Sequence, residues 1–297
     1  KSPKNDHIPT LTASAGDVET DGNDTTAAKK TGALFLDETP VVFQHLQLYA
    51  IRRTQTATGD MAKQANYKTL KEALETNQIK VTESGGGNGD AVNEMSPVTD
   101  EVNLSPRGGE TVNTLQVENT SNDTLFLMAG ELVKGGKQDR VIAQDMILPP
   151  KSGKQALPVF CVEHGRWTYH ADESASFSGY SNVASNSVRK AVVTAKDQGT
   201  VWSEVDEVTK ANTATSGTST YNALEKSDAF VTKRQPYLDF FKDKYKNQPE
   251  VVGVIALSGD SIIGADVFYN SFMFQKQYPN LLYSYVADVV TKPISTT

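Results

Sequence analysis

Residues 125–167 hold most of the side chains that could do chemistry. They include two acids, three cations, an amide and an indole, all at the ends of apolar runs or in tight turns: Glu131, Glu163, Lys137, Arg140, Arg166, Gln138 and Trp167. Polar groups at the ends of rigid elements are where function concentrates. Glu131 and Glu163 are therefore the candidate catalytic residues, as general acid and general base.

The cations, with Gln138 and Trp167, are candidate ligand-binding residues, because guanidinium and ammonium groups clamp phosphate and carboxylate. Gly135 and Gly136 precede Lys137, and glycines let consecutive N–H groups converge into an anion-binding concavity. This pattern predicts hydrolysis or binding of a phosphorylated or carboxylated ligand. The same charges also suit an ion-pair network that locks strand ends together, and the sequence leaves both interpretations open.

Asp266 is a further candidate ligand-binding residue, because it lies between Ala265 and Val267 in an apolar run. A carboxylate inside an apolar strand needs a partner. The predicted partner is Lys137, Arg140 or Arg166, or a helix N-terminus.

The cysteine and histidines do not form a recognisable metal motif. Cys161 and His164 are followed by His170 with spacing C-x2-H-x5-H, which matches no standard zinc pattern. A thiolate nucleophile is also disfavoured, because nearby Glu163 would raise the thiol pKa. We therefore predict no metal and no cofactor, and Cys161 is interpreted as a buried small hydrophobe.

Three runs carry a resemblance to a known family: G-E-x-x-x-G-x-K-Q-x-R at residues 130–140, C-V-E-x-G-R-W at residues 161–167, and Q-G-x-V-W at residues 198–202. They resemble the family named for its association with ADP-ribosylglycohydrolase and rhodanese-phosphatase proteins. The resemblance spans about residues 34–290. It implies no settled activity, but the name points to ADP-ribose or nucleotide metabolism.

Alternation of apolar and polar residues predicts strands over much of the chain. They are expected at residues 41–53, 79–81, 111–118, 125–131, 140–145, 158–164, 251–257 and 261–268. The 41–53 strand is expected to be buried on both faces, and the 111–118 strand to form a hairpin with the next. Helical spacing predicts helices at residues 67–76, 198–211, 221–230 and 272–290, the last interrupted near Pro279, and another opening at Pro236.

Strands come mostly before helices, which predicts an α+β fold. A mostly antiparallel sheet or sandwich is expected in the N-terminal two thirds, with helices from the C-terminal third packed on it. Residues 33–294 are predicted to form one domain, with a loop insertion at residues 84–110.

Residues 1–32 are polar and offer little to bury, which predicts a tail or an assembly arm. Such segments often follow a removed leader, so we expect a secreted or lipid-anchored protein outside the cytoplasm, with the cytoplasm as the alternative. The net charge of -7 argues against a nucleic-acid partner, and no apolar run reaches the roughly 18 residues of a membrane span.

Two functions follow from these observations. The first is an extracytoplasmic binding, structural or assembly protein that self-associates or meets a protein partner through its N-terminal arm. The second is a hydrolase-like enzyme, or a binding pocket, for an ADP-ribose-like or other phosphate-bearing small molecule.

Overall fold

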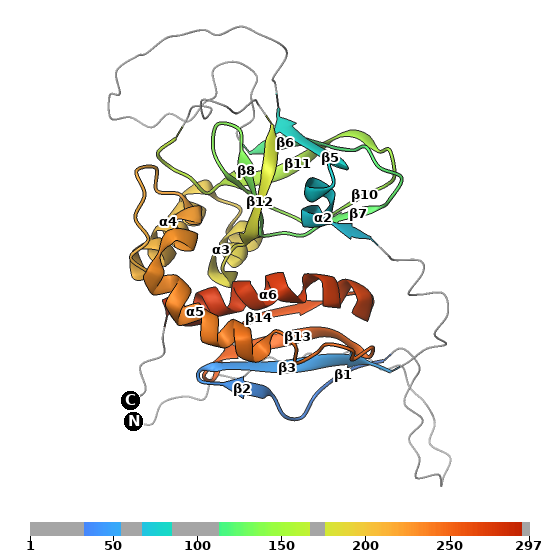
Figure 1. Ribbon diagram of the computed structural model, residues 1–297, viewed down its shortest axis with the longest axis vertical. Coiled ribbons are helices and arrows are strands. Elements are labelled where there is room, and N and C mark those ends of the chain that lie inside the picture. The colour runs from blue at the N-terminus through green and yellow to red at the C-terminus, as the bar shows by residue number, and fades with distance from the viewer. Residues whose placement is uncertain (1–32, 55–66, 85–112, 167–175, 293–297) are drawn as a thin grey trace, which may run out of the picture.

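The structure is a computed structural model that describes residues 33–54, 67–84, 113–166 and 176–292. Within these ranges the fold is α+β, as predicted. Figure 1 shows three layers: a curled sheet, a layer of helices and a second sheet. All pairs among the described strands are antiparallel except one, β4 with β7.

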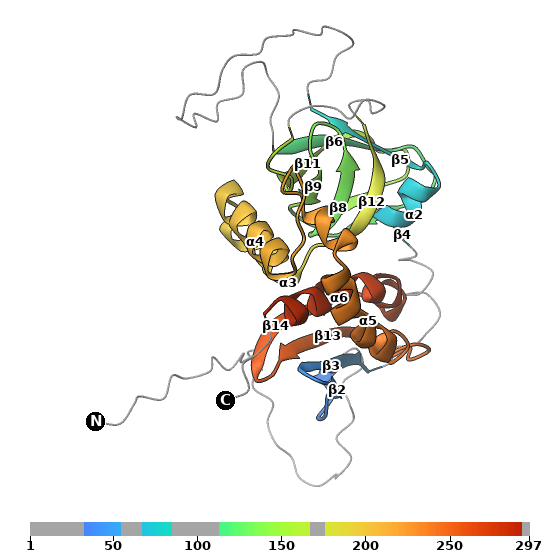
Figure 2. The same ribbon diagram turned by 60° about the vertical axis from the view of Figure 1, so that its left-hand side comes forward.

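The first sheet in chain order has the strand order β1-β3-β13-β14, with β2 also paired to β3. Its strands are β1 (Leu34–Leu36), β2 (Val41–Phe43), β3 (Leu46–Arg53), β13 (Val251–Ser258) and β14 (Ser261–Val267). Two helices, α5 (Asp228–Phe241) and α6 (Ser271–Thr291), cover one face of this sheet (Figure 2). Alternate residues of β3, such as Leu46, Leu48 and Ala50, are buried under these helices.

The curled sheet has the order β12-β8-β9-β11-β6-β5. Its strands are β5 (Ile79–Glu83), β6 (Thr114–Asn119), β8 (Glu131–Gly135), β9 (Arg140–Ile142), β11 (Gly153–Cys161) and β12 (Phe177–Val183). An isolated bridge between Thr82 in β5 and Ser176 before β12 joins the two ends. The sheet therefore curls almost into a barrel around its own apolar core, which includes Val117, Val159 and Phe177.

A small sheet of β4 (Lys68–Thr69), β7 (Leu125–Leu127) and β10 (Met146–Leu148) adjoins the curled sheet. Thr69 caps the short helix α2 (Leu70–Glu75) through a reciprocal capping box with Glu72. Such a box satisfies two N–H groups at the start of a helix. It explains why the helix begins at Leu70, three residues after the start that the leucine spacing predicted.

The remaining helices lie between or beside the two larger sheets. They are α3 (Asn186–Lys190), the π-helical turn η1 (Ala191–Ala195), α4 (Gln198–Ala211) and the 3-10 helix η2 (Tyr221–Lys226). Helix α6 contacts β13, β12 and α3, and its residues 281–291 are all buried. A helix that is apolar on all sides belongs between layers, and Figure 1 shows α6 in that place.

Several local predictions were wrong. Residues 41–53 form a hairpin rather than one strand, because Gln44 adopts φ 50° and reverses the chain. The second face of β3 is only partly buried. Strand β6 pairs with β5 and β11 rather than with the strand that follows it. The predicted 125–131 strand is broken by a turn at Ala129 and Gly130.

Both proline signals in the C-terminal third were also misleading. Helix α5 begins at Asp228, where Ser227 caps the N–H of Phe230, so Pro236 lies inside the helix and does not open it. Helix α6 runs through Pro279 without interruption. Proline removes one helical hydrogen bond. Packing of Phe230, Tyr237 and Phe241 of α5, and of the largely buried helix α6, outweighs that loss. The predicted insertion at residues 84–110 lies outside the described residues except for Ser84.

Candidate ligand-binding site

The predicted anion-binding turn between β8 and β9 is filled by groups of the chain itself. The N–H of Gly135 donates to Asp139 Oδ1 at 3.3 Å, and the N–H of Lys137 donates to Glu83 Oε1 at 3.0 Å. The N–H of Gly136 donates to the carbonyl of Ser176 at 3.2 Å. These three donors are therefore already engaged by internal acceptors.

Arg166 lies against the same turn. Its Nη2 is 2.7 Å from Glu163 Oε2 and its Nε donates to the same oxygen at 2.9 Å, while Nη1 donates to the carbonyl of Gly136 at 2.8 Å. Asp139 Oδ1 lies 3.6 Å from Arg166 Nη2. The predicted cation and the predicted acid thus meet, but they satisfy each other inside the protein.

Arg140 is fully buried. Its Nη1 donates to the carbonyl of Gln138 at 2.7 Å, and its Nη2 lies 3.8 Å from Glu83 Oε1. We call Glu83, Asp139, Arg140, Glu163 and Arg166 the buried ion network. It ties together β5, the β8–β9 turn and the chain that follows β11. Of the charges in the ion-pair interpretation, Arg140, Glu163 and Arg166 take part, but the acids Glu83 and Asp139 were not among those predicted and Glu131 lies elsewhere.

The acids of the buried ion network respond differently to burial. Burial raises the pKa of Glu163, but hydrogen bonds from Arg166 and from the N–H of Asp139 outweigh it, so the net shift is downward. Burial raises the pKa of Asp139, and the neighbouring charge of Glu163 adds to this rise. Glu163 is therefore held as a carboxylate by its partners.

Glu131 lies away from the buried ion network. Glu131 is the first residue of β8, and Gly135 is the last. Along an extended strand these two residues lie about 13 Å apart, so Glu131 is at the end of β8 away from the turn. Its oxygens accept from the N–H of Met128 at 2.7 Å and from the hydroxyl of Tyr180 at 3.3 Å. Burial raises the pKa of this fully enclosed carboxyl to about 8. The geometry does not bring Glu131 and Glu163 together across one bond.

Asp266 is paired with Arg189 rather than with any of the three cations that the sequence suggested. Arg189 Nη2 lies 2.6 Å from Asp266 Oδ1 and Nη1 donates to Oδ2 at 3.1 Å. The hydroxyl of Tyr285 also donates to Asp266. The prediction that this acid needs a partner is confirmed, and the partner comes from α3 because β14 faces that helix on its core side.

Sequence reasoning missed Arg189. A signal was present: Ser185 is an N-cap residue, and Val188 and Val192 are four apart. This spacing is typical of the buried face of a short helix. The segment could therefore have been recognised as helical. Its contact with Asp266 could not, because the two residues are 77 positions apart in the chain.

The absence of a side chain at Gly130 leaves room for the side chain of Arg189. The φ of Gly130 is +92°, a conformation that favours glycine, and a Cβ here would overlap Arg189 Cγ and lie 2.9 Å from Cδ. We expect Gly130→Ala to lower the free energy of unfolding by about 2–3 kcal/mol, from backbone strain and displacement of Arg189 together. Urea denaturation measures this change.

Gly153→Ala is the matched control for that prediction. Gly153 also has a positive φ, +64°, but nothing lies within 4 Å of its Cβ position. Strain alone should cost about 1 kcal/mol. Equal losses in the two variants would contradict the contact between residue 130 and Arg189.

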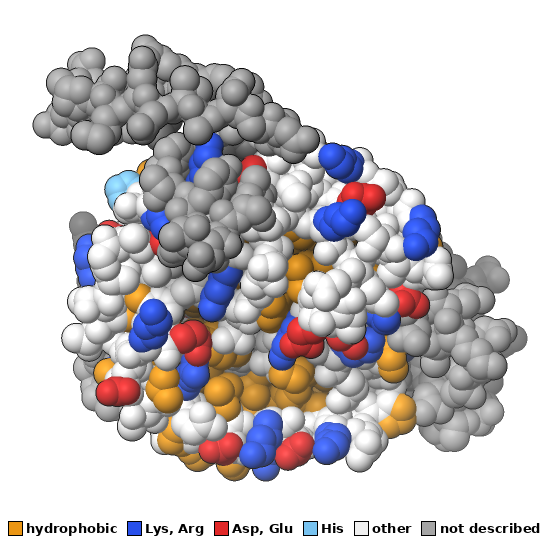
Figure 3. Space-filling model, turned by 45° about the horizontal axis from the view of Figure 1, so that its top comes forward, with side chains coloured by type: hydrophobic (Ala, Val, Ile, Leu, Met, Phe, Trp, Pro, Cys, Tyr) orange, Lys and Arg blue, Asp and Glu red, His pale blue; other side chains and the backbone are white. Residues whose placement is uncertain are grey.

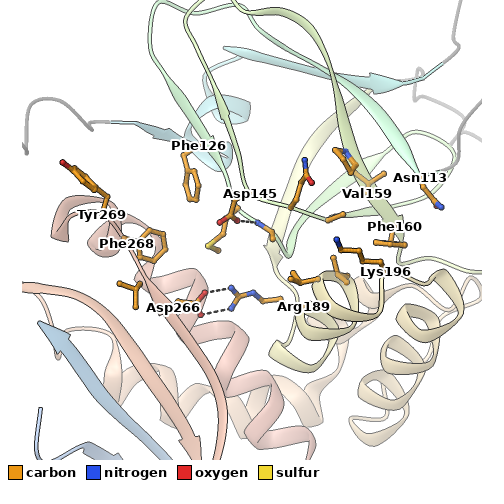
Figure 4. Close-up of a pocket in the computed structure, with 18 residues that line it drawn as sticks. Asn113, Phe126, Asp145, Val159, Phe160, Arg189, Lys196, Asp266, Phe268 and Tyr269 are labelled. Carbon is orange, nitrogen blue, oxygen red and sulfur yellow. Dashed lines mark hydrogen bonds and ion pairs between the residues drawn. The ribbon is translucent and has the colours of Figure 1, made fainter. Parts of the chain in front are cut away.

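The Arg189–Asp266 pair lies beside a cavity of about 690 Å³ between the curled sheet and the other two layers. Figure 4 shows three aromatic rings on one side of this cavity: Phe126, Phe268 and Tyr269. It shows a second polar and aromatic group on the opposite side: Asn113, Phe160 and Lys196. We call this space the interlayer pocket. Its volume is within the range of small-molecule sites.

The polar groups of the interlayer pocket differ in how far they are already engaged. Arg189 and Asp266 neutralise each other, with side-chain exposures of 12% and 15%. Asp145 is exposed and accepts from the N–H of Ala129 at 2.8 Å. Lys196 ends η1 in the left-handed conformation, φ 52°, and its side chain forms no ion pair within the described ranges. Lys196 and Asp145 are thus two charged groups of the lining that a ligand can reach.

A model of the ARG and Rhodanese-Phosphatase-superfamily-associated Protein domain, ARPP-1, matches residues 38–297. The chain belongs to the ARPP-1 family. This match confirms the resemblance seen in the sequence. Searches of curated proteins and of solved structures return no significant match.

The motifs that carried the resemblance have distinct places in this ARPP-1 chain. The first places Gly130 against the Arg189 side chain and contributes Asp139 and Arg140 to the buried ion network, and the second contributes Glu163 and Arg166. In the third motif, the Gln198 side chain pairs with the backbone N–H and carbonyl of Cys161. Gln138 is buried, Lys137 is half-buried, and Trp167 lies outside the described residues.

Cys161 is buried in this ARPP-1 chain, with 1% of its surface exposed. Burial raises the pKa of its thiol to about 11, although Arg140 opposes that rise. A thiol with this pKa is mostly protonated near neutral pH and is a poor nucleophile. His164 packs against Trp202, with ring centroids 4.3 Å apart.

Proposed function

We propose that the chain binds a small, phosphate-bearing molecule of the ADP-ribose type in the interlayer pocket. The observation that carries this proposal is the placement of Lys196 opposite the aromatic rings of Phe126 and Phe268 across one cavity (Figure 4). A ligand with an anionic group at one end and a flat ring at the other matches that arrangement. The residues of the buried ion network do not line this pocket. Of the ligand-binding residues that the sequence suggested, Asp266 lines it, whereas Lys137, Gln138, Arg140 and Arg166 do not.

Each part of such a ligand has a counterpart in the lining. The ammonium group of Lys196 suits a phosphate. Asp145 keeps one carboxylate oxygen for ligand hydroxyl groups, because Ala129 engages the other. Phe126 and Phe268 meet edge to face, with centroids 6.3 Å apart, and form an apolar wall for a ring. The family description, with its reference to ARG proteins, supports a ligand of this class.

The proposal is for binding, and hydrolysis would need further groups. A general acid and a general base must both reach one bond. Glu131 and Glu163, the predicted pair, lie outside the lining of the interlayer pocket. Asp145 and Asp266 line it, but Asp266 is held by Arg189 and Tyr285.

Calorimetric titration with ADP-ribose, ribose 5-phosphate and inorganic phosphate tests this proposal. We expect ADP-ribose to bind, and Lys196→Ala to weaken binding at least about 10-fold, which corresponds to about 1.4 kcal/mol. Asp145→Asn should weaken ADP-ribose binding but leave phosphate binding unchanged.

Lys190→Ala is the matched control, because Lys190 is an exposed lysine at the end of α3, six residues before Lys196, and does not line the interlayer pocket. Its affinity for ADP-ribose should remain within about twofold of the parent protein. Failure of all three probes to bind, or equal loss in Lys190→Ala and Lys196→Ala, would contradict the proposal.

The second candidate is an extracytoplasmic assembly protein. Exposed apolar residues on one sheet, such as Val42 and Ile262, favour assembly but do not bear on the location. Residues 1–32, the predicted arm, lie outside the described residues. Secretion or lipid anchoring also stays a prediction. None of the helices in the described ranges is long and apolar enough to cross a membrane.

The surface charge is compatible with either candidate. On the face that Figure 3 shows, cationic and anionic side chains are interspersed among apolar ones across the described residues. A broad surface of positive charge would attract a polyanion such as a nucleic acid. The mixed signs on this face instead favour a small ligand or a protein partner.

A further inference from the structure

One face of the β1-β3-β13-β14 sheet has no helix over it. Helices α5 and α6 cover the side formed by Leu46, Leu48, Val254 and Ala256. Because side chains alternate across a strand, the residues between these point to the opposite side. The two views in Figures 1 and 2 place both helices on the same side of the sheet.

Strand register identifies the residues of that opposite side. Ile255 pairs with Tyr49, Leu257 with Gln47, and Ile262 with Leu257. Directly paired residues share a face. The same register adds exposed apolar residues from the flanking strands, which we group as the outer sheet face: Leu34, Leu36, Val42, Ile262 and Val267.

The outer sheet face is strongly apolar for a surface. The exposed fractions are 50% for Leu34, 46% for Leu36, 49% for Val42, 70% for Ile262 and 48% for Val267. Among the described strand residues, Arg53 is the charged residue that register places on the outer sheet face. It pairs with Leu34 at the margin of this face. Contiguous apolar surface of this kind marks an interaction site.

We propose that two copies of this chain pack together through their outer sheet faces. The chain carries a net charge of -7, so two copies repel wherever their carboxylates meet. No strand residue that register assigns to the outer sheet face in the described ranges is an acid. This face therefore lets two copies meet without bringing their negative charges together.

A twofold axis makes such an interface self-complementary, because the same apolar residues serve both copies. Two sheets packed face to face lie about 10 Å apart with interdigitated side chains. This proposal does not depend on ligand binding. Val267 belongs to both the outer sheet face and the lining of the interlayer pocket, whereas Leu34, Leu36, Val42 and Ile262 do not line that pocket. Substitution of Lys196 or Asp145 should therefore leave dimerisation unchanged.

The area of the outer sheet face determines how tightly the two copies are expected to bind each other. Four strands spaced by about 4.8 Å and about seven residues of about 3.4 Å give a projected area of roughly 400–500 Å² per copy. A standard interface buries about 800 Å² per partner. The pairing should therefore be reversible and concentration-dependent, with a dissociation constant in roughly the micromolar range.

Sedimentation equilibrium of the full chain, from about 1 to about 500 μM, tests this proposal. We expect a monomer–dimer equilibrium, and Ile262→Lys and Val42→Lys should each raise the dissociation constant at least about 10-fold. Ile147→Lys is the control, because Ile147 is 53% exposed on β10, away from this sheet. These substitutions are on the surface, and circular dichroism would verify that each variant is folded.

Three outcomes would overturn the proposal. One is a monomer at every concentration. Another is a dimer that Ile262→Lys and Val42→Lys leave unchanged. The third is a monomeric full chain that dimerises, in an Ile262-dependent way, only after removal of residues 1–32, because the chain's own N-terminus would then be the occupant of the face.

Discussion

Replacement of Arg166 by methionine should lower the free energy of unfolding by about 3–5 kcal/mol, the range for removing one partner of a buried ion pair. The loss arises because Glu163 and Asp139 remain buried without the guanidinium that now neutralises them. Methionine retains much of the apolar stem, which limits the contribution of a cavity. Urea denaturation at neutral pH measures the change.

Lys210→Met is the control for Arg166→Met. Lys210 pairs with Asp206 at 3.2 Å, but the two side chains are 77% and 48% exposed. Exposed pairs contribute about 0–1 kcal/mol. If Arg166→Met changed stability by less than about 1 kcal/mol and abolished ligand binding, the network would be a binding site rather than a structural lock.

Glu131→Gln should change how stability depends on pH. The folded pKa of Glu131 is about 8, above the ordinary value of 4.5, because the carboxyl is buried. The folded state therefore binds more protons between these values, and stability that is full below pH 4.5 is lost as pH rises through 8. The full loss is at most about 5 kcal/mol.

Glutamine cannot ionise, so the variant should escape that loss. We expect Glu131→Gln and the parent protein to have similar stability near pH 5, with the variant more stable by up to a few kcal/mol near pH 9. Glu38→Gln, at an exposed position, should follow the parent protein across the range. Parallel stability curves for Glu131→Gln and the parent protein would show that residue 131 does not titrate in this interval.

Much of the fold could be predicted from local patterns. Strands β13 and β14 with their hairpin, helix α4 and helix α2 follow directly from alternation and helical spacing. The failures occur where one residue changes direction or where packing decides. Gln44 reverses the chain through a positive φ that its residue type does not signal. Pro236 and Pro279 are tolerated inside helices whose apolar residues pack on the rest of the fold.

The candidate site was predictable only in part. Arg140, Glu163 and Arg166 gather as expected, since short segments of the same curled sheet carry them. The partner of Asp266 was not predictable, because Arg189 reaches it from a different layer. The interlayer pocket depends on that long-range placement, so neither Lys196 nor Phe126 could be assigned to a site from neighbouring residues alone.

A crystal structure of the protein grown with ADP-ribose tests the central claim most directly. We predict ligand density in the interlayer pocket, with a phosphate within hydrogen-bond reach of Lys196 Nζ and the base against Phe126 and Phe268. Density at the buried ion network around Arg140 and Arg166, or at a surface away from both, would contradict it.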